Sequence, residues 1–273
     1  MTGRDYQGKS MILMVTFFLL LISSVLSASA SAPRADGIYF GEPLEGNRII
    51  IPDGAMEPVN RNIPDNLYVI TASGKKCPVE FLRKVTAVRT DRSVIKRSGP
   101  VFSYKEEPCG DFPIIMVSED FLKQHVPVAV SQGTMKPLGK EEVSRIEKAR
   151  KAHVHKSWKI ASLDDGTVFA LVQFVITEKD PSSCLVLIAK DELVFEDYET
   201  IEIDDTKKKP GSGDDDIRTP DVVQIINVFR TAQGLEIVRR LDGHEGTNTD
   251  LMREDGSGFK VIRRNYFYWG PNL

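Results

Sequence analysis

The chain is poor in the residues that metal, redox and disulfide-scaffold proteins require. Its 273 residues include only three cysteines and four histidines. No Cys-x-x-Cys pair is present, and three cysteines at such wide separations do not suit a zinc site. The sequence therefore supports neither a thiol redox centre nor a zinc centre.

The sequence also lacks a strong excess of charge of either sign. The formal net charge is -3, from 36 basic and 39 acidic residues. Proteins that bind nucleic acid usually carry a marked basic excess, which attracts the phosphate backbone. We therefore expect no nucleic-acid partner.

No catalytic motif is recognisable either. The Gly-x-Ser-x-Gly pattern of serine hydrolases and the phosphate-binding loop of nucleotide-binding proteins are both absent. The stretch Ser73–Lys76 matches Ser-x-x-Lys, but it lies in a turn instead of opening a helix, as that mechanism requires. We assign no catalytic residue, and a binding protein is favoured over an enzyme.

Apolar runs that approach the length of a membrane span are absent except near the amino terminus. There, Arg4 and Lys9 precede the apolar run Met11–Leu26, and small residues follow it. This order is typical of a secretory signal peptide with cleavage before Ser31, and the run falls short of the ~20 residues of a spanning helix. We predict a signal peptide over residues 1–30, a periplasmic or secreted location, and no stable membrane span after cleavage. A retained anchor is the alternative.

The three cysteines are expected to include one pair, because exported proteins fold in an oxidising compartment. Cys77 and Cys109 both lie beside proline in turn-like sites of the same half of the chain. They are the predicted disulfide, which would stabilise the fold by about 3–4 kcal/mol. Cys184 precedes an apolar run and is predicted to be a buried free thiol.

What the sequence does contain is a series of short β-branched runs separated by turn residues. The clearest series covers residues 222–268, where glycine dipeptides such as Asp242-Gly243 separate the runs. This pattern predicts a meander of antiparallel strands. A short helical turn is predicted at Ser118–Gln124, with Ser118 as its N-cap.

The fold class that we predict is a β-rich α+β protein with antiparallel sheets and one charged connecting helix. Val143, Ile146 and Ala149 recur at three-residue spacing and place a narrow apolar stripe on that helix. Two similar meanders, on either side of an acidic loop, form either one continuous sheet or two facing sheets. The predicted parts are the signal peptide (1–30), a strand-rich N-terminal domain (31–136), the connecting helix (137–158) and a β-meander domain (159–273) that contains the acidic loop (202–219).

One connection in the meander offers several oxygen ligands. Asp242, Glu245, Asn248 and Asp250 lie within nine residues of each other, and hard cations such as calcium prefer such donors. These four residues are the predicted metal site, and calcium is the only cofactor that we consider. A polar turn whose side chains satisfy each other is the alternative.

These observations favour an exported, non-catalytic binding or envelope-associated protein. A metal- or carboxylate-dependent hydrolase that uses the acidic connection is one alternative. An inhibitor or neutralising partner of another exported protein is the other.

Overall fold

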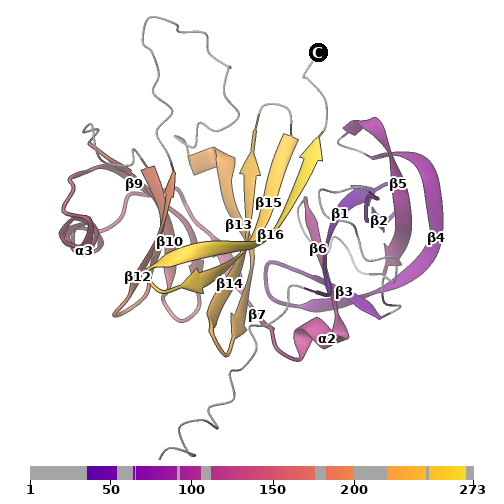
Figure 1. The fold of residues 1–273 in the computed structure, drawn as a ribbon, viewed down its shortest axis with the longest axis horizontal. Helices are drawn as coiled ribbons and strands as arrows, with labels where there is room; N and C mark the ends of the chain where they lie inside the picture. Colours follow the sequence, from indigo (N-terminus) through magenta and orange to yellow (C-terminus); the bar gives the residue numbers. More distant parts are fainter. Residues whose placement is uncertain are drawn as a thin grey trace, which may run out of the picture. The chain divides into compact units, whose positions relative to one another are not determined.

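The computed structural model describes residues 36–53, 64, 66–90, 93–105, 112–175, 183–198, 220–243 and 246–268. All of them belong to one compact unit that extends from Ala35 to Leu273. Strands predominate among the described elements and almost all neighbouring strands are antiparallel (Figure 1). The predicted β-rich α+β class is thus confirmed.

The first six strands form a closed barrel. Their order is β1-β2-β5-β4-β3-β6, and β6 pairs back onto β1. Alternating side chains such as Ile49, Phe102 and Met116 form the buried core of this barrel. The strands are β1 (Ile38–Leu44), β2 (Arg48–Ile50), β3 (Leu67–Ile70), β4 (Lys76–Thr90), β5 (Ser93–Tyr104) and β6 (Ile114–Ser118).

The other ten strands form one strongly curled sheet, in the order β7-β13-β14-β15-β16-β12-β11-β10-β9-β8. β7 and β8 are its two end strands, although only Ala129 separates them in the sequence, so the ends of the sheet approach each other. The side chain of Gln132 on β8 donates a hydrogen bond to the carbonyl of Ile225 on β13 at 2.9 Å. One apolar cluster fills the inner face and draws side chains from all ten strands. The strands are β7 (Val126–Val128), β8 (Val130–Gln132), β9 (Val154–Leu163), β10 (Val168–Phe174), β11 (Ser183–Ile188), β12 (Leu193–Tyr198), β13 (Val223–Thr231), β14 (Gly234–Asp242), β15 (Gly246–Asp255) and β16 (Gly258–Tyr268).

The two predicted meanders belong to this single sheet, which decides between the two arrangements left open by the sequence. They join where β12 runs parallel to β16. Among the described residues, only Phe195 and Gly258 are paired across this junction. It is therefore the least extensively paired boundary of the sheet.

Two short α-helices accompany the strands in the part of the chain that the structure describes. α2 (Glu119–Leu122) confirms the predicted helical turn, because the hydroxyl of Ser118 accepts a hydrogen bond from the backbone N–H of Phe121 at 3.1 Å. α3 (Lys140–Arg150) buries Ile146 against the outer face of β10 and β11. Both faces of β10 are consequently covered, which explains the continuous apolar run of that strand. A single 3-10 turn, η2 (Pro220–Val222), precedes β13.

The barrel packs against the outer face of β13–β16. Phe121 meets Phe229 edge to face, with 5.2 Å between the ring centroids, inside a shared apolar cluster. The side-chain amide of Asn227 on β13 donates a hydrogen bond to the carbonyl of Ile70 on β3 at 3.2 Å. Apolar and polar contacts together fix the barrel to the sheet.

This arrangement differs from the predicted division into domains. The barrel ends at Ser118, and β7 and β8, expected in the N-terminal domain over 31–136, lie in the ten-stranded sheet. The helix is shorter than the predicted 137–158, and it connects β8 with β9, which pair with each other, so it does not join two domains. A short apolar strand carries no local signal for the sheet that it enters, so the sequence could not specify this assignment.

The cysteines also differ in part from expectation. Cys184 is a fully buried free thiol, as predicted. Cys77 is a free thiol in the barrel core, so the structure does not contain the predicted disulfide, and Cys109 lies outside the described residues. The predicted signal peptide and the acidic loop at 202–219 also lie outside the described residues.

Candidate functional site

The structure separates the predicted metal ligands. β14 and β15 are paired so that Asp242 lies opposite Thr247 and Asp250 lies opposite Arg239. Since side chains alternate along a strand, the carboxylates of Asp242 and Asp250 point to opposite faces of the sheet. Asn248 shares the face of Asp250, and Glu245 lies outside the described residues.

Asp250 is buried in an ionic cluster on the inner face of the sheet. Its carboxylate accepts hydrogen bonds from Nη2 of Arg239 at 2.5 Å and from Nε of Arg264 at 2.7 Å. The side chain is fully buried. Two guanidinium groups therefore occupy the carboxylate that was predicted to bind a cation.

The same cluster reaches across the parallel junction to β12. Nη1 of Arg239 donates to the carboxylate of Glu196 and to the hydroxyl of Tyr198, the latter at 2.9 Å. Burial raises the pKa of Glu196 and of Tyr198, against the opposing effect of Arg239. The cluster thus connects β12 to β14, β15 and β16, where backbone pairing is sparse, and we assign it a structural role.

Asp242 is engaged on the opposite face. Arg240 donates to it through Nε at 2.8 Å and Nη2 at 2.5 Å, and the hydroxyl of Thr247 donates at 2.6 Å. Arg240 also donates to the carbonyl of Phe112 at 2.8 Å. This carboxylate therefore helps to hold the sheet to the barrel side of the molecule. Within the part of the chain that the structure describes, no group of three or more His, Cys, Asp or Glu side chains is placed to hold a metal.

A second buried polar group lies where the chain passes from the barrel to the sheet. Nδ1 of His125 lies 2.7 Å from the carbonyl oxygen of Phe121, and Nε2 lies 3.3 Å from Oε2 of Glu236. Both ring nitrogens face an oxygen acceptor, so a neutral imidazole with one N–H satisfies only one of them. Arg253 Nε donates to the other oxygen of Glu236 at 2.7 Å, so this group too is held within the protein.

Exposed basic and apolar side chains lie together on the hairpin of β4 and β5. These two strands carry six basic residues and one acidic residue, in a chain whose net charge is -3. Arg89 and Lys96 lie directly opposite each other, and both are exposed. Like charges at opposed positions destabilise a strand pair. Neither side chain has an ion pair with any acidic residue that the structure describes.

Two large apolar side chains are exposed on the same hairpin. Phe81 is 49% exposed and Leu82 is 46% exposed. Phe81 touches Phe102 at the edge of its ring, with centroids 5.7 Å apart, but half of its surface faces solvent. Leu82 is the extra residue of a β-bulge between Phe81 and Arg83. A single exposed apolar side chain is common on a strand that has one face in solvent. Two adjacent large apolar side chains that are both exposed favour a binding surface.

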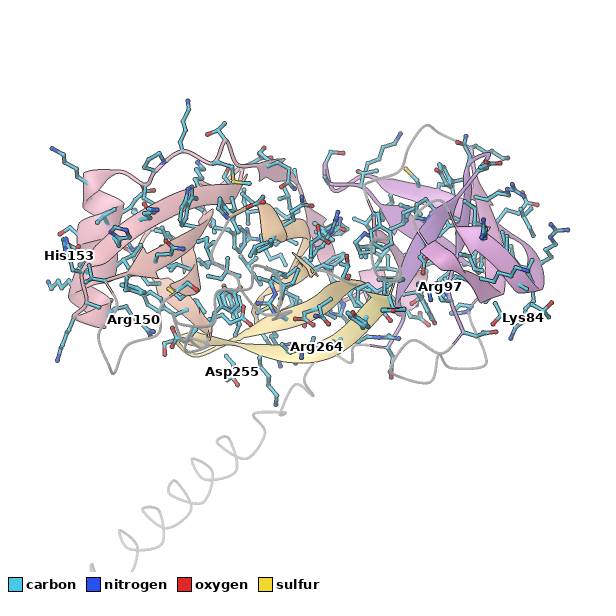
Figure 2. The ribbon with its side chains drawn as sticks, turned by 90° about the horizontal axis from the view of Figure 1, so that it is seen from above. Lys84, Arg97, Arg150, His153, Asp255 and Arg264 are labelled. Carbon is cyan, nitrogen blue, oxygen red and sulfur yellow. The ribbon has the colours of Figure 1, made fainter. Side chains whose placement is uncertain are left out.

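The hairpin is held firmly to the barrel. Val85 and Val88 pack on a small apolar cluster around Ile50. Arg97 donates through Nε to Glu42 at 2.7 Å and through Nη2 to the carbonyl of Tyr268 at 2.6 Å. Figure 2 shows Arg97 on the side of the hairpin toward β16 and Lys84 on its outer side. The exposed side chains of the hairpin are therefore held in place by its contacts with the barrel and with β16.

Sequence reasoning missed this surface. The local pattern at 79–88 fits either a short helix or a strand, and only the strand pairing shows that Arg89 lies opposite Lys96. The available signal was the local basic excess within an acidic chain.

Comparison with known proteins identifies no relative. No family model matches the chain, and neither a curated protein nor a solved structure matches it. Among the described helices, none has the length and apolar character needed to cross a membrane.

Proposed function

We propose that this chain is an exported, non-catalytic protein, periplasmic or secreted, that binds a partner at the cell envelope through the β4–β5 hairpin. The observation that carries the proposal is the exposed pairing of Arg89 with Lys96 on a strand pair that also exposes Phe81 and Leu82. In the isolated protein these features cost stability, through like-charge repulsion and exposed apolar surface. A partner with negative charge relieves the first cost, and apolar contact relieves the second.

The remaining charged groups support a binding role over catalysis. Arg239 and Arg240 each pair with acidic side chains and span strands of the sheet, and Asp242 and Asp250 lie on opposite faces. A hydrolase that used the two aspartates together would need them in one site. The sequence supplies the export part of the proposal through the basic start and the apolar run before Ser31.

Cell fractionation and site-specific cross-linking test the proposal. The chain is expressed in its own host, and the intact mass of the product is measured in the cytoplasmic and exported fractions. We expect an exported product that begins at Ser31. A soluble cytoplasmic product that retains the first thirty residues would refute the export part.

A photoreactive residue at Thr86, an exposed position of the hairpin, tests the binding part. The control carries the same residue at Lys148, an exposed position of α3. We expect adducts with envelope material at Thr86 and far fewer at Lys148. Equal labelling at the two positions contradicts a hairpin-directed interaction, and turnover in a broad hydrolase screen that one point substitution abolishes contradicts the non-catalytic assignment.

A further inference from the structure

We infer that the partner of the β4–β5 hairpin is an anionic lipid surface, whose phosphate groups bind Arg89 and Lys96 and whose apolar layer receives Phe81 and Leu82. This inference rests on the proposed function, because it names the partner class of the same hairpin.

The charge of the hairpin requires an anionic partner. Arg89 and Lys96 oppose each other across the strand pair and repel, so negative groups that bind them both gain attraction and remove the repulsion. Arg83 is also exposed, but it lies opposite Val101 and therefore on the other face of the hairpin from Arg89. Among the described residues, Glu42 pairs with Arg97 and Asp53 pairs with Lys84, so these two carboxylates are engaged by other cations of the hairpin.

Apolar contact selects lipid among the anionic partners. A phosphate-rich surface with an apolar layer beneath it accepts cationic and apolar side chains from the same face of a protein. Phe81 and Leu82 immediately precede Arg83 and Lys84, so the two kinds of group are adjacent in the hairpin. A nucleic acid or an acidic peptide satisfies the cations, but it offers no comparable environment for the leucine.

The extent of the surface favours an extended partner. Register pairs Phe81, Lys84 and Arg89 with alternate residues of β5, so these side chains lie on one face of the hairpin. Their partners Phe102 and Lys96 are six residues apart on β5, so at about 3.3 Å per residue the surface extends over roughly 20 Å. A lipid surface spans that distance, whereas one small anion does not. Since Val85 and Val88 fix the hairpin to the barrel, little conformational entropy is lost on binding.

Vesicle co-sedimentation tests the inference. The protein is the chain from Ser31, which contains the whole compact unit from Ala35 onward. It is mixed with vesicles of phosphatidylglycerol and phosphatidylcholine in equal parts, or of phosphatidylcholine alone. We expect binding to the anionic vesicles only, weakened by added salt because salt screens exposed charges.

Paired variants assign the binding to the hairpin. Arg89→Thr with Lys96→Thr is expected to lower the partition coefficient about 25-fold, from about fivefold for each cation. The matched control is Lys136→Thr with Lys140→Thr, which removes the same charge from two exposed positions away from the hairpin and keeps binding within about twofold of the parent. Phe81→Ser with Leu82→Ser is expected to cost about tenfold or more without a change in charge. Thermal melting of each variant checks that the fold is retained.

Three outcomes overturn the inference. They are equal binding to neutral and anionic vesicles, equal loss in the hairpin and control pairs, and binding to an oligonucleotide or to polyglutamate but not to vesicles. Any of these leaves the proposed function intact if Thr86 still cross-links to envelope material. Failure of the proposed function instead shows in the cellular fractionation, which does not depend on vesicle binding.

Discussion

Replacing Arg239 with methionine tests whether the ionic cluster holds the two halves of the sheet together. Arg239 is 2% exposed and is the largest fully buried side chain among the described residues. Its guanidinium group contacts Glu196, Tyr198 and Asp250, which come from two strands besides its own. Methionine keeps much of the apolar stem and removes the charge and the hydrogen bonds.

The expected loss of unfolding free energy follows from these contacts. Removing one member of a buried ion pair costs about 3–5 kcal/mol, because the other charge stays buried without compensation. Asp250 retains Arg264, whose side chain is 52% exposed and therefore stabilises less strongly. Glu196 already has a raised pKa, chiefly because of burial, and can take up a proton more readily when Arg239 is absent. We therefore expect a loss of about 3 kcal/mol, at the lower end of the range.

Urea unfolding measures this loss. Far-UV circular dichroism and the fluorescence of Trp158, which packs against the inner core of the sheet, follow the transition. The matched control is Arg230→Met, which breaks an exposed ion pair with Asp165 and should cost less than about 1 kcal/mol. The double variant Arg239→Met with Asp250→Asn removes the stranded charge.

The double variant should be more stable than the sum of the single losses predicts, by about 1 kcal/mol or more. A loss in Arg239→Met no greater than that in Arg230→Met would refute the reasoning. Strictly additive losses would show that Arg239 and Asp250 do not act as a pair.

Three further predictions concern other buried groups. Burial raises the pKa of Glu196, so its contribution to stability is complete below the ordinary carboxyl value of 4.5 and declines as pH rises through the folded-state pKa. The substitution Glu196→Gln should therefore flatten the fall of the urea midpoint between pH 4.5 and neutrality. An unchanged slope would contradict the assignment. Burial also raises the pKa of Cys184, and Cys77 is 4% exposed, so neither thiol should react with iodoacetamide before the protein unfolds. Peptide mass mapping measures this reaction. The same mapping without reductant tests the Cys77–Cys109 disulfide, because a linked peptide would show a bond that the structure lacks. Phe229→Ala should cost about 3–5 kcal/mol in urea unfolding, because Phe229 is fully buried between sheet and barrel; a loss below about 1 kcal/mol would mean that the two parts do not depend on this contact.

Local pattern was sufficient for the strands but not for the site. The glycine turns at Asp242-Gly243 and Asp255-Gly256 and the alternating runs around them predicted the four strands at the end of the chain, which form β13–β16. The capping role of Ser118 also followed from local sequence, because an N-cap contacts a residue three positions away. The predicted metal site did not come together, since the alternation that defines a strand sends Asp242 and Asp250 to opposite faces once their partners across β14 are known.

The amino-acid sequence by itself determined the class of fold, the positions of most turns and the expectation of export, because each of these depends on residues close together in the chain. Only the tertiary structure decided the closure of the barrel, the single curled sheet and the contact of Arg239 with Glu196, 43 positions away. It also decided that Arg89 opposes Lys96, which is the basis of the proposed binding surface. The physical reason is that alternation states which side chains share a face, whereas the register and the neighbouring strand decide what that face meets.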